Sequence, residues 1–276
     1  MKNLTKSIVA CLLSSSSLAF AVPVTTTIAD NFIGGRDAGA APIINRDVIS
    51  EDLSEAFNID NMQVTIYRAA GTIAVKIVTE WHDPSSNGTF NFGEGYDVQT
   101  GDLFISTNGW APFGAAPYVA DDASNGEDWE YVFDTSNGSL YGGAFGISKS
   151  QDEMTGSLIF SGDGSFAYRD NQETRRSTGG TQSGIGAITW STNAENDADG
   201  IAYVIYSFAL ADIGIVDPSS AINLGFHWTM TCGNDVIEGG ITSDGGGGGG
   251  GEVPEPGTLL LAGLGLVGLG LRRRTK

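Results

Sequence analysis

The chain has 276 residues, of which 41% are apolar, 33 are acidic and 14 are basic, giving a formal net charge of −19. This charge repels phosphate backbones and anionic lipid, which argues against nucleic-acid binding, and it attracts cations such as Ca²⁺. The apolar share suffices for a core, and 40 glycines among short Val, Ile, Thr and aromatic runs favour all-β structure.

Residues 1–21, MKNLTKSIVACLLSSSSLAFA, have the parts of a secretory signal peptide. Lys2 and Lys6 form a positive start, an apolar stretch interrupted by serines follows, and Ala19 and Ala21 form an A-x-A cleavage site. We therefore expect export through the secretion translocon and cleavage after Ala21 by signal peptidase.

The two cysteines have different expected fates. Cys11, in the sequence IVAC, loosely fits a lipidation site, but the apolar stretch before it is only three residues and too short for that role. Removal of the signal peptide leaves Cys232 alone, so no intramolecular disulfide can form. Its neighbours, HWTMTC, alternate as in a strand, which favours a buried thiol.

Residues 46–59, RDVISEDLSEAFNI, fit either a short helix or two short strands around a polar turn. The clearest local pattern follows, because apolar residues alternate with polar ones from Met62 to Ile66 and again from Ile73 to Ile77, around Ala70-Gly71. This pattern predicts a β-hairpin with one buried face.

Further runs predict strands along the rest of the body, at residues 101–106, 129–133, 143–148, 156–161, 185–191, 201–210, 222–230 and 235–241. Turn sequences such as SNG, GDG and DADG separate many of them. Many short strands without long helices predict an all-β fold, a jelly-roll-like β-sandwich that takes residues 22–243 as one domain.

One acidic loop, ENDADG at residues 195–200, resembles the first half of a Ca²⁺ site. Glu195, Asp197 and Asp199 alternate before a glycine, but Tyr206 stands at loop position 12, where an EF-hand has Glu. The loop therefore predicts either a structural Ca²⁺ site or a solvated polar turn.

A second acidic loop, ADDASNGED at residues 120–128, offers the same two alternatives. Its carboxylates include Asp121, Asp122 and Asp128, which supply the oxygen ligands that Ca²⁺ prefers.

The chain shows no compact catalytic motif. His82, in EWHDP, lacks a zinc-ligand pattern, and His227 and Cys232 have a spacing that fits no common zinc finger, so we expect both histidines to be structural. The sequence has no G-x-S-x-G, phosphate-binding loop or E-x-D-x-x-E motif. We therefore expect no enzyme activity and no cofactor other than Ca²⁺.

Five tryptophans are spread through the body, and most tryptophans of a β-sandwich lie in its core. Trp110, in the loop-like sequence TNGWAPFG, is the best candidate to stack on a sugar ring.

Residues 244–252 include seven consecutive glycines and predict a flexible linker. In residues 253–276, the uncharged stretch Thr258–Leu271 would span roughly 21 Å as a helix, against roughly 30 Å for the hydrocarbon core. It is short for a lasting anchor, and the arginines after it favour a cytoplasmic C-terminus.

The segment VPEPGTLLLAGLGLVGLGLRRR closely resembles the PEP-CTERM sorting signal of Gram-negative bacteria. The resemblance rests on three parts in order: the PEP motif, the short apolar helix and the arginine cluster, with Val253, Pro254, Glu255, Pro256, Arg272, Arg273 and Arg274. It implies recognition at the inner membrane by an exosortase, cleavage near residues 254–256, and delivery to the cell surface or an exopolysaccharide matrix. The alternative is an ordinary single-pass anchor.

The body also resembles a recurrent group of PEP-CTERM exported proteins of unknown activity, through residues 28–35, 101–110, 127–133 and 224–241. This second resemblance implies one continuous domain and brings no catalytic residues. The leading hypothesis is a non-catalytic structural or adhesive surface protein. The alternatives are a carbohydrate- or Ca²⁺-binding lectin-like module and a secreted glycan hydrolase.

Overall fold

The computed structural model describes residues 22–34, 58–79, 89–91, 97–153, 169, 171–191 and 202–245. The predicted signal peptide, His82, the strand at 156–161, the loop 195–200 and the tail 253–276 lie outside these ranges, as do residues 46–57 of the ambiguous segment.

The described chain is built almost wholly of strands. They are β1 (Val24–Ala29), β2 (Ile59–Tyr67), β3 (Thr72–Thr79), β4 (Thr89–Asn91), β5 (Asp97–Gln99), β6 (Leu103–Ser106), β7 (Tyr131–Asp134), β8 (Ser139–Lys149), β9 (Glu173–Ile185), β10 (Ala187–Trp190), β11 (Ala202–Ala209), β12 (Ile222–Thr229) and β13 (Val236–Ser243). Only one turn of α-helix, α2 (Ser150–Glu153), and one 3₁₀ turn, η1 (Leu210–Ile213), accompany them. The all-β prediction is confirmed.

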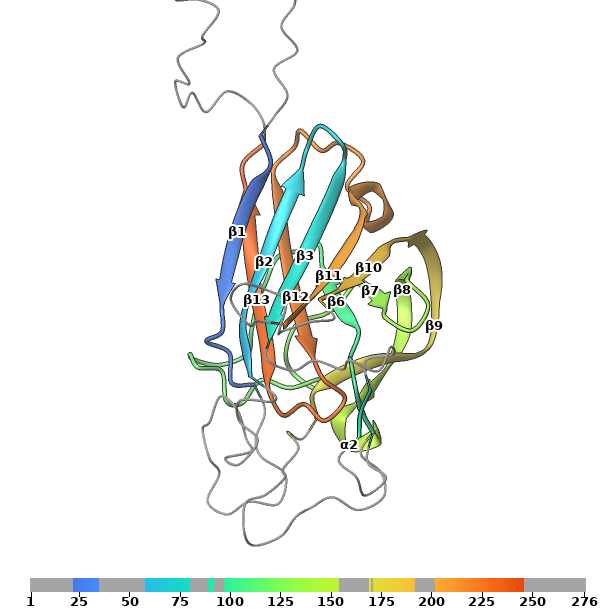
Figure 1. Ribbon diagram of the computed structural model, residues 1–276. Helices are drawn as coiled ribbons and strands as arrows, with labels where there is room; N and C mark the ends of the chain where they lie inside the picture. Colours follow the sequence, from blue (N-terminus) through green and yellow to red (C-terminus); the bar gives the residue numbers. More distant parts are fainter. Residues whose placement is uncertain are drawn as a thin grey trace, which may run out of the picture.

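The strands form two large antiparallel sheets (Figure 1). The five-stranded sheet has the order β1-β2-β3-β11-β10, the six-stranded sheet has the order β13-β12-β6-β7-β8-β9, and β4 pairs with β5 separately. The 12-6-7-8 order is similar to a Greek key, since a late strand lies beside the first of three consecutive ones. Strands β1 to β3 form a simple meander, so the jelly-roll description does not fit the order of that sheet.

The predicted hairpin and its buried face are confirmed. β2 pairs with β3 through Val64 opposite Val75 and Ile66 opposite Ile73. The alternating apolar residues of both strands are buried, while Gln63, Thr65 and Tyr67, which alternate with them in β2, face outward. Seven of the eight further predicted runs overlap described strands, namely β6, β7, β8, β10, β11, β12 and β13, and the eighth lies outside the described residues.

Strand β9 was missed because its sequence, ETRRSTGGTQSGI, is polar and contains glycines. It pairs with β8 alone at the edge of the six-stranded sheet, with several register shifts. From Ser177 onward the residues of this edge strand are mostly exposed, so the apolar alternation that reveals inner strands is missing there.

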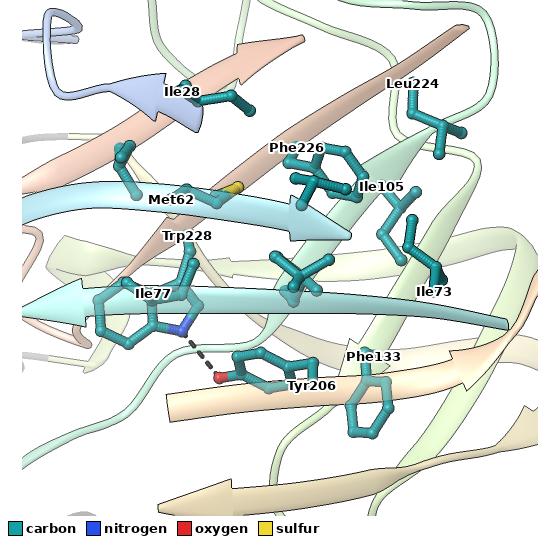
Figure 2. Packing of buried hydrophobic residues seen from close by; sticks show 14 of the residues in the cluster. Ile28, Met62, Ile73, Ile77, Ile105, Phe133, Tyr206, Leu224, Phe226 and Trp228 are labelled. Atoms are coloured by element: carbon teal, nitrogen blue, oxygen red, sulfur yellow. Dashed lines mark hydrogen bonds between the residues drawn. The ribbon is translucent and has the colours of Figure 1, made fainter. Parts of the chain in front are cut away.

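One apolar core joins the two sheets. Ile28, Met62, Ile73 and Ile77 of the five-stranded sheet belong to the same buried cluster as Ile105, Phe133, Leu224, Phe226 and Trp228 of the six-stranded sheet (Figure 2). Within it, the Trp228 Nε1 donates to the Tyr206 hydroxyl over 2.8 Å. Cys232 is also buried there, and burial raises the pKa of its thiol to about 12, as expected for an unreactive cysteine.

The chain passes between the sheets at Gly186, where β9 ends and β10 begins. A Cβ at this residue would lie 2.4 Å from the Phe133 ring and 2.5 Å from the Ser207 carbonyl oxygen, so a side chain cannot fit. Glycine therefore allows the direct crossing from one sheet to the other.

Arg68, in the turn between β2 and β3, ties this hairpin to the other sheet. Its guanidinium donates to the carbonyl oxygens of Pro218, Ser220, Ser243 and Asp244, and to the Ser243 hydroxyl. We call this set of contacts the Arg68 clamp. It fixes residues 218–220, which precede β12, and residues 243–244 at the end of β13.

Within the described ranges, no helix combines the length and the apolar character needed to cross a bilayer. The predicted tail helix lies outside them.

Candidate functional site

Residues 107–130, here called the covering loop, lie against β12 and β13 on the side away from the core. Gly225 and Gly240 leave room for it, because a Cβ at Gly225 would lie 2.8 Å from the Gly109 carbonyl oxygen, and one at Gly240 would lie 2.6 Å from the Trp110 Cβ. Glycines in otherwise apolar strands thus mark a close approach of backbone.

Glu238 stands at the centre of the polar contacts under this loop. Its Oε1 accepts a hydrogen bond from the Trp110 Nε1 over 2.8 Å, and its Oε2 lies 3.0 Å from the His227 Nδ1. The His227 Nε2 lies 2.7 Å from the Glu173 carbonyl oxygen. Since both ring nitrogens face acceptors, a doubly protonated imidazolium satisfies both and balances the Glu238 charge.

Aromatic rings enclose the histidine. The Phe104 and Trp129 ring centroids lie 5.7 and 5.8 Å from that of His227. The Trp129 Nε1 also donates to the Glu173 Oε1 over 3.3 Å. We name Asp121, Glu173, His227 and Glu238 the buried acid cluster; each of the four side chains lies out of solvent.

Burial shifts the protonation of this cluster. It raises the pKa of Asp121 to about 7, with the Glu238 charge adding to the effect, and it also raises the pKa of Glu173. Burial alone would lower the pKa of His227, but the hydrogen bond to Glu238 and the Glu173 charge outweigh it, so this pKa is raised. Asp121, Glu173 and His227 therefore hold protons in the folded protein more tightly than the same groups do in the unfolded chain.

Asp121→Asn should make the protein less sensitive to pH. A carboxyl whose pKa is about 7 when folded and 3.8 when unfolded binds more protons in the folded state, so the free energy of unfolding falls as pH rises from about 4 to 7. The raised pKa of His227 acts in the same direction, because its contribution is complete below about 6.5 and is lost above the folded pKa.

Urea unfolding between pH 4.5 and 8 measures this effect. We expect Asp121→Asn to flatten the slope and to be more stable than the parent protein at pH 8. The control is Asp128→Asn in the same loop, since Asp128 is exposed. Parallel pH profiles for Asp121→Asn and the parent would contradict the assignment.

The structure places Trp110 and Asp121, predicted for two different roles, on the same covering loop, where each interacts with Glu238. The Trp110 ring is half-buried and meets the Tyr118 ring edge-on at 5.3 Å, with its Nε1 engaged by Glu238. Stacking on a sugar would use the remaining ring surface, and that role stays a prediction.

Carboxylates of the loop 120–128 accept hydrogen bonds from neighbouring backbone amides. Asp121 accepts from the Phe113 amide over 2.5 Å, and Asp122 accepts from the Ser124 amide over 2.7 Å. Among the described residues, no group of three His, Cys, Asp or Glu side chains is placed to hold a metal ion. The Ca²⁺ hypothesis for Asp121, Asp122 and Asp128 stays a prediction, and that for Glu195, Asp197 and Asp199 falls outside the described residues.

Sequence reasoning missed Glu173 and Glu238 as partners of His227. In register, Glu238 lies directly opposite His227 in the β12–β13 hairpin. The available signal was a charged residue within the otherwise apolar run DVIEGGI, facing a histidine across a short turn. With 4% and 5% of their surfaces exposed, Glu238 and Glu173 are buried, and their side chains accept hydrogen bonds from Trp110 and Trp129.

Comparisons with known proteins give one match. The family model described as the PEP-CTERM protein-sorting motif matches residues 252–274. Neither a curated protein nor a solved structure matches the chain. The motif implies export, sorting to the cell surface and an exosortase as processing partner. The chain therefore carries, as its sequence predicted, the PEP-CTERM protein-sorting motif at residues 252–274.

Proposed function

We propose that this protein is a non-catalytic structural or adhesive component of the cell surface or of an exopolysaccharide matrix. The observation that carries the proposal is the match of residues 252–274 to the sorting motif. Processing near Pro254–Pro256 would follow a transient stage at the inner membrane, held by the short apolar tail. Release of that tail would leave the body as the working molecule.

The body suits such a role as a β-sandwich, with the two sheets packed face to face on their shared core. A glycan hydrolase needs two carboxylates across an open cleft. In the buried acid cluster the carboxylates are buried and bonded to neighbouring side chains instead: Glu173 to Trp129 and Glu238 to His227. This arrangement favours a stabilising role.

Deletion of residues 253–276 tests the sorting part of the proposal. In a host that has an exosortase, we expect the full chain to be shortened at its tail and to reach the surface fraction, and the deletion variant to lose both. Mass spectrometry of the mature chain and cell fractionation measure the two outcomes. Unchanged localisation and processing would overturn the proposal.

Two further variants separate the parts of the tail. Alanine at Pro254, Glu255 and Pro256 should block cleavage while the chain stays at the membrane, whereas glutamine at Arg272, Arg273 and Arg274 should impair retention.

The proposed lack of catalysis has its own test, in which the purified full chain is incubated with the host exopolysaccharide. Release of new reducing ends would contradict it.

A further inference from the structure

A groove of about 630 Å³ lies on the outward side of the five-stranded sheet, away from the buried acid cluster. Residues of β3, β10 and β11 line it, together with Tyr67 at the end of β2 and with Ile185 and Gly186 before β10. The volume is within the usual range of ligand sites.

The groove carries no charge, although the chain is strongly acidic. None of its twelve lining residues is ionisable at neutral pH. Among the strands of this sheet, Asp60 is the only acidic residue and sits at the bulge that begins β2. The one basic residue of these strands is Lys76, whose Nζ lies 4.2 Å from the Tyr203 ring centroid.

Four hydroxyl groups line the groove: those of Tyr67, Thr72, Thr189 and Ser207. Within the described parts of the chain, none of the four makes a side-chain hydrogen bond, unlike the hydroxyls of Thr25 and Thr65, which bond to each other on the same face. Polar groups on a ligand can therefore pair with them without breaking an internal contact.

Apolar groups alternate with these hydroxyls. Ile185 is 72% exposed and Tyr67 is 39% exposed, and Ile205 also lines the groove. Solvent-exposed apolar side chains in a concave site, interspersed with hydroxyls, suit a ligand that itself alternates C–H faces and hydroxyl groups. A sugar ring has this character, and an aromatic side chain such as Tyr67 can stack on it.

We propose that this groove binds a segment of a neutral polysaccharide. The choice of a neutral rather than an anionic polysaccharide follows from charge. Residues 22–257 carry 8 basic and 33 acidic residues, a net charge of −25 that repels a polyanion. The same charge opposes a second copy of this chain as the occupant. That the ligand is a polymer of the matrix rests on the proposed function, whereas the hydroxyl-lined, uncharged groove stands independently of it.

Affinity electrophoresis of the purified full chain in mild detergent tests the groove. The probes are a soluble β-glucan, dextran and galactomannan, with alginate as the polyanionic comparison. We expect retardation by at least one neutral polysaccharide and none by alginate. Tyr67→Ala and Ser207→Val should each weaken binding about five- to tenfold. Phe113→Ala is the matched control, since Phe113 is 49% exposed on the covering loop.

The proposal is overturned if no neutral polysaccharide binds, or if Tyr67→Ala and Phe113→Ala weaken binding equally. It is also overturned if light scattering shows a dimer that Tyr67→Ala dissolves, because a second copy would then occupy the groove. Binding is measured on purified protein, so its failure leaves the sorting experiment untouched, and failed sorting leaves the binding result untouched.

Discussion

Glu238→Ala should lower the free energy of unfolding by about 3–5 kcal/mol at pH 7, the usual cost of removing one partner from a buried ion pair. The variant leaves the His227 Nδ1 and the Trp110 Nε1 without their acceptor, and the His227 side chain is fully buried. It also removes the contact that holds Trp110 of the covering loop against β13. Guanidinium unfolding followed by tryptophan fluorescence measures the loss.

Glu238→Gln is the matched control. The amide oxygen can still accept from the Trp110 Nε1, and the amide nitrogen can donate to a neutral His227, so we expect a loss of less than about 2 kcal/mol. Equal losses for the alanine and glutamine variants would show that the charge and hydrogen bonds of Glu238 do not hold the covering loop.

Trp228→Ala should also lower the free energy of unfolding by about 3–5 kcal/mol, because it opens a cavity in the core shared by the two sheets. Trp228 is fully buried, and its indole meets the Tyr206 hydroxyl of the opposite sheet (Figure 2). We expect a lower denaturant midpoint, measured by circular dichroism, with one transition for both sheets.

Tyr206→Phe separates the hydrogen bond from the packing. It keeps the ring and removes the hydroxyl that accepts from Trp228 and lies 3.3 Å from the Thr135 hydroxyl, so the expected loss is about 1–3 kcal/mol. If Trp228→Ala costs no more than Tyr206→Phe, the indole does not fill the core as described.

The sequence predicted those parts of the fold in which side-chain alternation reports burial. Strands β2, β3 and β11 each bury one face against the core, so their apolar residues recur at every second position. Strand β9 escaped notice because an edge strand with solvated faces leaves no such pattern. The register and the crossing at Gly186 depend on contacts between distant residues, which a local pattern does not contain.

The site was less predictable than the fold, for the same reason. Trp110 and Asp121 were selected singly, and their sequence positions gave no sign that a loop would bring both beside Glu238. Glu173 is 54 residues from His227 along the chain, and its carbonyl oxygen, which any residue could supply, makes the contact. The sorting motif was predictable because its parts are contiguous and are recognised as sequence.

The Arg68 clamp has a mechanical consequence. Ser243 and Asp244, just before the glycine run, accept hydrogen bonds from the Arg68 guanidinium, which belongs to a hairpin of the other sheet. A pull on the tail, as a tethered chain meets when it is extracted or sheared, would otherwise peel β13 from β12 one hydrogen bond at a time. The clamp passes that force into the β2–β3 hairpin, so the two sheets resist it together.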